Sequence, residues 1–575
     1  MTIRDRALVG VLSVALVILS AIVLAPSLGS SGGAATPPPT VDAGPIYVEG
    51  VLGSATNASP FGARSAADRQ LVALIFRGLV RLGPGGALMP DLAESWETDA
   101  TGERWTFHLA PDQVWQDGTP ITATDVAFTV ARLADPLYDG PGAGSWGEVS
   151  ASVADPLTVV LTLATPLGGF LQAATQPIAP AHLLADVPVE QLSSDPFGQH
   201  PIGSAWFRLV DFTAGSAKLA AWTAAEAVGE GGGPGLATPP PTDSLGGATT
   251  APRGLRPYLT GIEFRYFDDE ELLLAAWAAG TLEAMSGLPG DRVAEVAAQP
   301  GVRIMKYPTS TLLSIVIDLR TGAASLPDPA VRRALLTAID RGRIVRTILS
   351  GFGTVADGPI PAWSAMFDAT ASARVPYSPA EAIGDLGDAG WKRVDGAWYP
   401  KGGNKPIGLE VLSPARDVNP IAWAVADAVV ADWRAIGLVA THTTPEAGQV
   451  FSDQLRAGDF QLAVAPEVIG LDPDLYPLLA STQAKAGGSN VGGLQDPALD
   501  KLLAAARKPG TEEERKAAYS ALQIRLAAQM YLLPIAFRDE VIVVRGTLSG
   551  PVVRPVGASG DRFWDVLTWR LADGR

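Results

Sequence analysis

Residues 71–130 place a strand, a turn and a helix start in close succession, and this order strongly limits how the chain can fold. The middle part alternates apolar with polar residues, which predicts a half-buried strand. The apolar members are Trp105, Phe107 and Leu109. Residues 117–120 have turn chemistry, because glycine accepts positive φ and proline fixes its backbone angle. Thr122 or Thr124 can then cap a helix, and we also expect a short helix at residues 91–96.

The letters of this segment are informative in their own right. Residues 92–97 read LAESWE, and residues 115–128 read WQDGTPITATDVAF. Both stretches resemble a segment of the extracytoplasmic solute-binding proteins of family 5, which serve ABC importers of oligopeptides, dipeptides and nickel chelates. The resemblance implies that the chain captures a small molecule and delivers it to permease subunits.

Further stretches resemble the same family in the same order along the chain. Residues 328–341 read DPAVRRALLTAIDR, which is similar to the family's DPRVRRALAYAIDR helix. Shorter matches occur at residues 282–284, 377–391, 458–462, 472–474 and 496–502. One short match is weak, but this many in family order make the resemblance specific.

The resemblance implies a mixed α/β (α+β) body with the two-lobed fold of periplasmic binding proteins, a hinge and an extra inserted domain. Lobe I is expected to comprise residues 46–75, 201–305 and 534–575, with the inserted domain at residues 76–200 and lobe II at residues 306–533. A solute would bind between the lobes and favour their closure, because a ligand shifts a conformational equilibrium only when it binds one state better. No catalytic residue is needed for this mechanism.

Length, charge and cysteine content narrow the function. A chain of 575 residues exceeds one hydrophobic core, so two or three domains are expected. The net charge of −17 argues against a nucleic-acid partner, because phosphate binding requires clustered Lys and Arg. The absence of cysteine excludes disulfides, thiolate metal sites, thiol nucleophiles and a lipid-modified cysteine.

The N-terminal residues 1–29 are expected to be a signal peptide or a membrane anchor. Residues 7–25 carry no charge and, as a helix, would nearly span a hydrocarbon core. Arg4 and Arg6 precede this run, so the rest of the chain should lie outside the cytoplasm, in the periplasm or at the outer face of the membrane. Residues 30–45 form a Gly, Ser and Pro linker, and a second low-complexity stretch at residues 229–257 is expected to be a disordered surface insertion.

At two motifs that bear on ligand contacts, this chain departs from the family. The family's GTGPY turn resembles residues 203–207, where Trp206 replaces proline. In peptide-binding members an Asp pairs with the ligand's amino terminus, but Ile469 stands at that position, so Glu467 is the candidate substitute. The full set of candidate ligand-binding residues is Gly53, Ser54, Asn57, Trp206, Ser310, Thr311, Trp363, Glu467 and Asp472.

The sequence offers little support for catalysis or for a cofactor. It has no phosphate loop of the GK[ST] type, no HExxH and no GxSxG motif. The four histidines are isolated in sequence, so neither a metal site nor a cofactor is expected. The ligand remains open between a peptide, a nickel chelate and another polar solute. A sensor or chaperone-like binder is the alternative function, and a peptide hydrolase is a third.

Overall fold

The computed structural model describes residues 44–143, 146–223, 257–320, 326–372, 374–446, 448–485 and 488–572. The expected signal or anchor, residues 30–43 of the linker and nearly all of the insertion at residues 229–257 lie outside these ranges. Within them, no helix combines the length and the apolar character that crossing a membrane requires. The description below therefore concerns the body that begins at Gly44.

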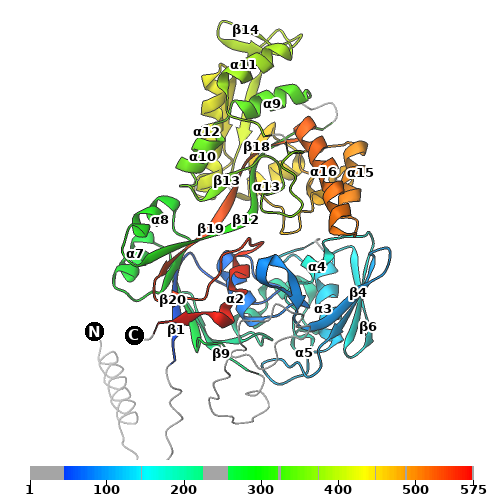
Figure 1. The fold of residues 1–575 in the computed structure, drawn as a ribbon, viewed down its shortest axis with the longest axis vertical. Coiled ribbons are helices and arrows are strands. Elements are labelled where there is room, and N and C mark those ends of the chain that lie inside the picture. The colour runs from blue at the N-terminus through cyan, green and yellow to red at the C-terminus, as the bar shows by residue number, and fades with distance from the viewer. Residues whose placement is uncertain are drawn as a thin grey trace, which may run out of the picture. The chain divides into compact units, whose positions relative to one another are not determined.

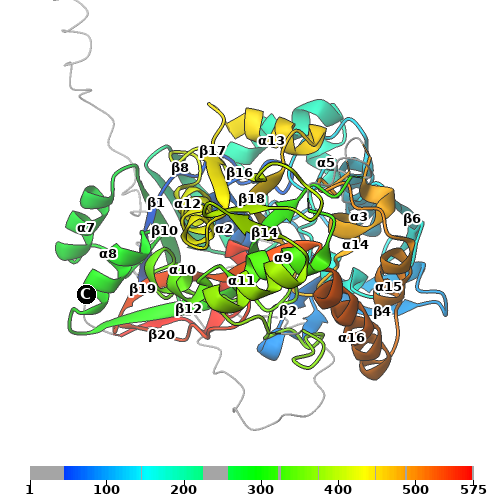
Figure 2. The same ribbon diagram turned by 90° about the horizontal axis from the view of Figure 1, so that it is seen from above.

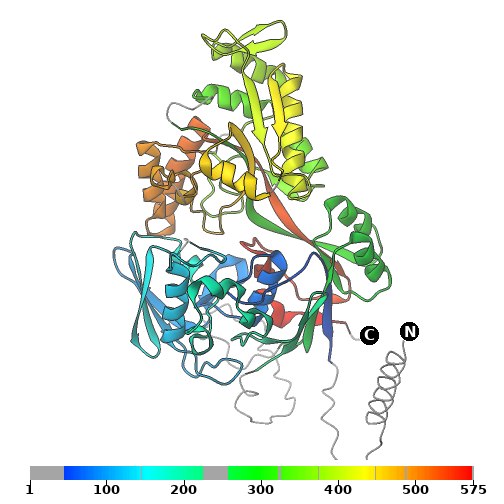
Figure 3. The ribbon, with the colours of Figure 1, turned by 180° about the vertical axis from the view of Figure 1, so that it is seen from behind.

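One sheet of 11 strands runs through this body in the order β17-β16-β18-β12-β19-β11-β1-β10-β9-β8, with β13 also paired to β19. Strands β12 and β19 lie antiparallel and pass side by side between two groups of elements (Figures 1 and 3). We call the group around β1, β10 and β11 lobe I, and the group around β16, β17 and β18 lobe II. The strands of this sheet are β1 (Ile46–Leu52), β8 (Phe207–Thr213), β9 (Ser216–Ala221), β10 (Gly261–Phe267), β11 (Ala284–Ser286), β12 (Val302–Ile317), β13 (Gly353–Val355), β16 (Gly408–Leu412), β17 (Val439–Thr443), β18 (Leu462–Val468) and β19 (Leu532–Arg545).

The register of β12 against β19 is interrupted between the lobes. On the lobe I side Val302 pairs with Arg545 and the ladder continues to Pro308, whereas on the lobe II side it resumes at Leu312 opposite Phe537. Such an irregularity bends a strand and leaves residues without a ladder partner. The sheet is therefore interrupted at the point where the chain crosses from one lobe to the other.

A smaller four-stranded sheet confirms the strand predicted at Trp105, Phe107 and Leu109. Its order is β4-β5-β7-β6, and α3 packs against it. The bounds are β4 (Ala93–Thr98), β5 (Arg104–Leu109), β6 (Val149–Asp155), β7 (Thr158–Leu163) and α3 (Ala123–Ala134). Of the two candidate caps, Thr122 is the one used, and it forms a capping box with Asp125.

The short helix expected at residues 91–96 is wrong, because this stretch enters β4. Trp96 pairs with Phe107 across the antiparallel ladder, so the edge of β5 supplies backbone partners that outweigh local helix propensity. The carboxylate of Asp91 accepts a hydrogen bond from Arg77 at 2.6 Å instead of capping a helix.

Lobe II contains the stretch at residues 328–341 that resembles the family's helix. This stretch forms α9 (Pro329–Thr337) and the first residue of α10 (Arg341–Thr347), because Asp340 caps a new helix start. Helices α15 (Pro497–Arg507) and α16 (Glu512–Gln529) lie next to each other (Figure 2). The remaining elements of lobe II include α11 (Pro379–Asp388), α12 (Pro420–Ala435), α13 (Gly448–Ala457), α14 (Tyr476–Leu479), β14 (Lys392–Val394) and β15 (Ala397–Tyr399).

Lobe I keeps β9 and β10 together despite the long stretch between them. Ile262 pairs with Leu219, so the two strands on either side of this stretch are neighbours in the sheet. The remaining elements of this part of the chain include β2 (Val80–Leu82), β3 (Leu88–Pro90), β20 (Leu548–Ser549), β21 (Arg570–Leu571), α2 (Ala66–Ile75), α4 (Phe170–Ala173), α5 (Ala181–Leu184), α7 (Glu270–Ala278) and α8 (Gly290–Ala297).

A buried ion pair lies in the core of lobe I. Arg562, 1% exposed, donates to both carboxylate oxygens of the fully buried Glu49 at 2.8 and 2.9 Å. Tyr47 and Ser286 donate hydroxyl hydrogen bonds to the same carboxylate. Burial alone would lower the pKa of Arg562, but the negative charge of Glu49 together with smaller contributions from Tyr47 and Glu540 outweighs burial, and the pKa is raised. Arg562 is therefore held in its charged form.

Removing the cation of this pair should destabilise the fold strongly. Arg562→Met leaves Glu49 as an uncompensated buried charge, so the free energy of unfolding should fall by about 3–5 kcal/mol. Urea denaturation at pH 7 measures this change. The double variant Glu49→Gln with Arg562→Met removes both charges and should recover part of the loss, whereas a single variant within about 1 kcal/mol of wild type would contradict the prediction.

Candidate functional site

The irregular part of β12 brings three of the predicted residues together. Strand β18 pairs with β12 so that Thr311 lies opposite Val468 and Leu312 lies opposite Glu467. The carbonyl of Ser310 accepts from the backbone of Ile469 at 3.1 Å, and its hydroxyl accepts from the backbone of Gly470 at 3.0 Å. We call residues 308–312, 467–470 and 537–539 the crossing region. Ser310 is fully buried there and holds the two strands together.

Glu467 is a carboxylate without a partner at the crossing region. Among the described residues, no ion pair and no side-chain hydrogen bond reaches it. The side chain is only half-buried, yet burial raises the pKa of Glu467 to about 7. The exposed fraction and the raised pKa are consistent with a carboxylate that protein atoms surround on most sides and that water still reaches on one. Such a group is suited to bind a cation.

The position at which peptide-binding relatives were expected to carry an Asp is apolar here. Ile469 is 6% exposed and belongs to a hydrophobic cluster with Leu312 and Phe537. A carboxylate in that place would be surrounded by apolar side chains.

Gly53, Ser54 and Asn57 lie in lobe I, near the start of α2. Gly53 has φ of +122° and donates its backbone N–H to Phe267 at 2.9 Å. Asn57 is occupied by contacts within the protein, because its side chain accepts from the backbone of Ser59 and donates to the carbonyl of Ser193. Ser54 is exposed. Within the described ranges, no hydrogen bond or ion pair joins these three residues to the crossing region.

The two predicted tryptophans differ in their surroundings. Trp206 is half-buried, packs against the core of lobe I and lies 5.6 Å from the guanidinium of Arg77. Trp363 is also half-buried, and its indole N–H is buried without a hydrogen-bond partner in the described part of the chain. An unsatisfied buried donor costs free energy, so Trp363 is the better candidate for a ligand contact.

Asp472 lies at a contact between lobe II and the loop that follows strand β7 of the four-stranded sheet. Its carboxylate accepts from Arg515 at 2.6 Å. The backbone N–H of Gly168 donates to the carbonyl of Arg507 at 2.5 Å, and a Cβ at Gly169 would lie 2.7 Å from an oxygen of Asp472. Because glycine has no side chain, these two elements can approach this closely. We call residues 168–169 with 472 and 507–508 the lobe contact.

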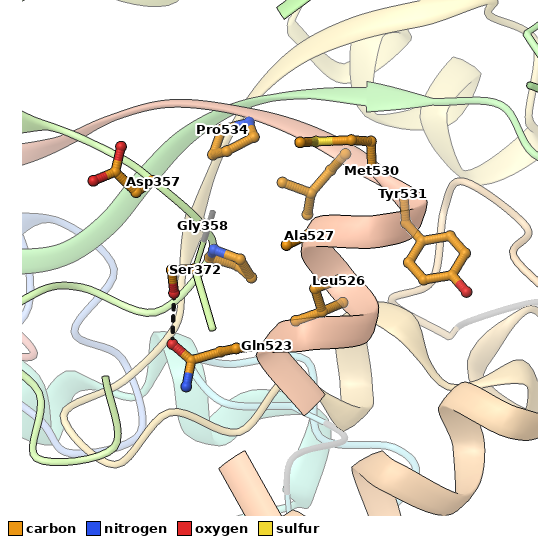
Figure 4. A pocket seen from close by; sticks show the side chains of 11 residues that line it. Asp357, Gly358, Ser372, Gln523, Leu526, Ala527, Met530, Tyr531 and Pro534 are labelled. Atoms are coloured by element: carbon orange, nitrogen blue, oxygen red, sulfur yellow. Dashed lines mark hydrogen bonds between the residues drawn. The ribbon is translucent and has the colours of Figure 1, made fainter. Parts of the chain in front are cut away.

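A pocket in lobe II lies apart from all of these residues. It has about 400 Å³ of empty space, part of it open to solvent, and it lies between the end of α16, the start of β19 and the loop at residues 357–359 (Figure 4). Its walls are mostly apolar, and Ser372 donates to Gln523 at one side. None of the predicted ligand-binding residues lines it, so we assign the candidate site to the crossing region instead.

In the described part of the chain, no three His, Cys, Asp or Glu residues are placed to hold a metal ion. His182 pairs with Asp117 at 2.9 Å, and His442 contacts the hydroxyl of Ser413 at 2.8 Å. These histidines serve local contacts.

Comparison with known proteins identifies the family. Residues 87–490 match the model of the bacterial extracellular solute-binding proteins, family 5 (middle). The chain belongs to this family. A glutathione-binding protein, GsiB, of Shigella flexneri is 23% identical over 87% of this chain and 90% of its own length.

Two solved structures share the fold. The oligopeptide-binding protein AppA of Bacillus subtilis, in complex with a nonapeptide, has a TM-score of 0.69 at 21% identity and covers 92% of this chain and 99% of its own. NikZ of Campylobacter jejuni, in complex with Ni(L-His), has a TM-score of 0.69 at 22% identity and covers 91% of this chain and 99% of its own. The expected α/β, two-lobed fold is thus confirmed.

The family also confirms the general function predicted from sequence. The chain is an extracytoplasmic solute-binding component of an ABC importer, which works with permease subunits. It binds a solute and is not an enzyme.

The lobe contact leads to a prediction about closure. Gly168→Ala would place a Cβ 2.8 Å from the backbone carbonyl of Lys508, so the contact could not form without a shift. We expect the closed form to lose about 1–3 kcal/mol, and ligand affinity to fall roughly tenfold. Isothermal titration calorimetry with the retained native ligand measures this. Gly215→Ala is the control, because no atom lies within 4 Å of its Cβ; equal affinities for both variants would refute the prediction.

Proposed function

We propose that this protein captures a peptide, or a polar solute of similar size, and that Glu467 binds a cationic amine of that ligand. The half-buried carboxylate at the crossing region, which has no partner among the described residues, carries this proposal. A buried charge without a partner is costly, and an ammonium group would supply the missing partner. The other contacts are proposed to come from Thr311 and Trp363 in lobe II and from Gly53 and Ser54 in lobe I.

The named ligands of similar proteins support an amine. GsiB is named for glutathione, and the structures of AppA and NikZ contain a nonapeptide and Ni(L-His). Each of these ligands is built from amino acids and can carry an amino group. For this chain the amine would meet Glu467 rather than residue 469, which is isoleucine.

Capture is proposed to proceed by closure of the lobes about the crossing region. Residues 46–75, 201–305 and 534–575 are assigned to lobe I, residues 76–200 to an inserted domain, and residues 306–533 to lobe II. The interruption in the pairing of β12 and β19 supports a hinge there, because residues outside a regular ladder can change their backbone angles at low cost. Ligand bridging both lobes would then favour the closed form.

The N-terminal segment is proposed to direct export and to remain as a membrane anchor. Its uncharged run at residues 7–25 follows Arg4 and Arg6, as in proteins whose N-terminus stays in the cytoplasm. Intact mass spectrometry of the protein from the native membrane fraction tests this. A mature N-terminus near residue 30, in protein released from the membrane, would instead identify a cleaved signal.

The class of ligand can be tested with a defined panel. Calorimetry and small-angle X-ray scattering should be run on wild type with tetraalanine, glutathione, L-histidine and L-histidine with Ni²⁺. Heat of binding together with compaction for at least one amine-bearing probe would support the proposal. Binding of amine-free solutes alone, in an extended panel, would refute it.

Glu467 also predicts how ligand affinity depends on pH. The pKa of its carboxyl is about 7, so the group is mainly charged at pH 8 and mainly neutral at pH 5. An amine binds the charged form, so affinity should fall about 10- to 100-fold from pH 8 to pH 5. Glu467→Gln should bind weakly at both values and lose this dependence, as calorimetry at the two pH values would show.

The same carboxyl affects stability without ligand, with a definite sign. Its folded pKa lies above the unfolded value, so the charged form destabilises the fold, and this cost appears as pH rises through the range from about 4.5 to 7. Glu467→Gln should therefore raise Tm at pH 8 and leave it unchanged at pH 4. Glu94→Gln, an exposed site on β4, is the control. A variant that lowers Tm at pH 8 would show that Glu467 has a stabilising partner.

A further inference from the structure

The segment proposed as the inserted domain shares one hydrophobic core with lobe I. This core contains Tyr47 of β1 together with Phe107 of β5 and Phe170 of α4. A buried hydrogen bond also joins the two parts, because the hydroxyl of Tyr138 donates to the carbonyl of Phe61 at 2.9 Å. A close-packed core transmits a displacement instead of absorbing it. The inserted domain and lobe I should therefore move as one body.

Two turns of the inserted domain reach lobe II, and each has glycine at its tip. The first turn contains residues 168–169 of the lobe contact. The second contains Gly102, which has φ of +73° and whose Cβ, if present, would lie 2.3 Å from Cγ of Pro509. The backbone N–H of Leu163 donates to the carbonyl of Glu103 at 2.8 Å, so both turns lie at the same end of the four-stranded sheet. We call Gly102 and residues 168–169 the tips.

The surface of lobe II under the tips is held in shape by contacts within lobe II. Arg515 donates to Asp472 at 2.6 Å, and Arg507 lies 3.1 Å from Asp474. Burial raises the pKa of Asp474, and the charge of Arg507 opposes this effect. The tips contribute backbone atoms, such as the N–H of Gly168 that donates to the carbonyl of Arg507. The contact can therefore form and break without burying or exposing an unpaired charge.

The tips meet lobe II far from the crossing region. The residues that they touch precede the start of α16, whereas β19 follows the end of α16 and leads into the crossing region. The 18 residues of α16 separate these two places by about 27 Å. Figures 1 and 3 show the start of α16 close to α4 and away from the place where β12 and β19 cross. A small rotation at the crossing region is therefore enough to separate the tips from lobe II.

We propose that the inserted domain is a latch, whose tips hold lobe II against lobe I through a contact that involves no ligand atom. The free protein then populates the closed form, and a bound solute has to supply only the rest of the free energy of closure. This inference rests on the hinge of the proposed function. It does not depend on Glu467 or on the identity of the ligand.

A disulfide can test the latch in the full chain, which has no cysteine of its own. The test variant combines Gly169→Cys with Asp472→Cys. A Cβ at residue 169 would lie 3.1 Å from Cβ of Asp472, near the spacing of about 3.5–4.5 Å found in disulfides. The control combines Gly215→Cys with Asp472→Cys, because Gly215 lies between β8 and β9 at the far edge of the main sheet. Both variants lose the pairing of Asp472 with Arg515, so they differ only in the position of the second cysteine.

The expected result is rapid closure of the disulfide without any solute. Both variants are stripped of bound solute in guanidinium, refolded and treated with oxidised glutathione, and their free thiols are counted over time. The pair at residues 169 and 472 should form an intramolecular disulfide at least about ten times faster than the control, because adjacent thiols have a high effective concentration. Equal rates would overturn the latch. So would a disulfide that forms only after tetraalanine or L-histidine with Ni²⁺ is added.

A second pair keeps the test decisive if the first variant does not fold, which thermal denaturation checks. Gly102→Cys with Pro509→Cys leaves Asp472 in place, and a Cβ at residue 102 would lie 3.3 Å from Cβ of Pro509. Its control is Gly215→Cys with Pro509→Cys, and the same two outcomes apply.

The latch and the proposed function can fail separately. Binding of an amine-bearing probe by wild type, without faster oxidation of either test pair, would overturn the latch and leave the role of Glu467 standing. Faster oxidation of a test pair, together with binding of amine-free solutes alone, would support the latch and refute the role of Glu467.

Discussion

The antiparallel pairing of β12 with β19 is the interaction on which the rest of the structure depends. These two strands belong to one continuous sheet, and each of them contributes to the cores of both lobes. A continuous ladder would make the molecule rigid, because every backbone group would be paired. The interruption at residues 308–312 releases a few residues from that requirement. The β12–β19 pair therefore joins the lobes and, between them, leaves a few residues without ladder partners.

Charged side chains have contrasting surroundings at two places in the molecule. In lobe I, Glu49 and Arg562 are fully buried and satisfy each other, so this pair contributes to the fold and is not available to a ligand. At the crossing region, Glu467 keeps some exposure and has no ion pair and no side-chain hydrogen bond among the described residues. A molecule that binds and releases its ligand needs such unpaired groups, because strong internal partners would compete with the ligand.

The sequence predicted the family, the two-lobed fold and many elements, because periodic apolar residues and capping residues act locally. Thr122 capped a helix, and Trp105, Phe107 and Leu109 lay on a strand, as expected. Residues 91–96 were mistaken for a helix because their pairing partner, β5, is a tertiary feature. Of the nine candidate ligand contacts, Ser310, Thr311 and Glu467 come together, whereas Asn57 is occupied by contacts within the protein.

The separation of Glu49 and Arg562 along the chain has a consequence for biogenesis. The two residues are 513 positions apart, so the cation that neutralises Glu49 is synthesised long after Glu49 itself. Until then the nascent chain carries a carboxylate that cannot be buried at low cost. Native-like packing around Glu49 therefore has to wait until Arg562 has been made. A polypeptide that has to thread through a translocation channel before it folds gains time from this order of assembly.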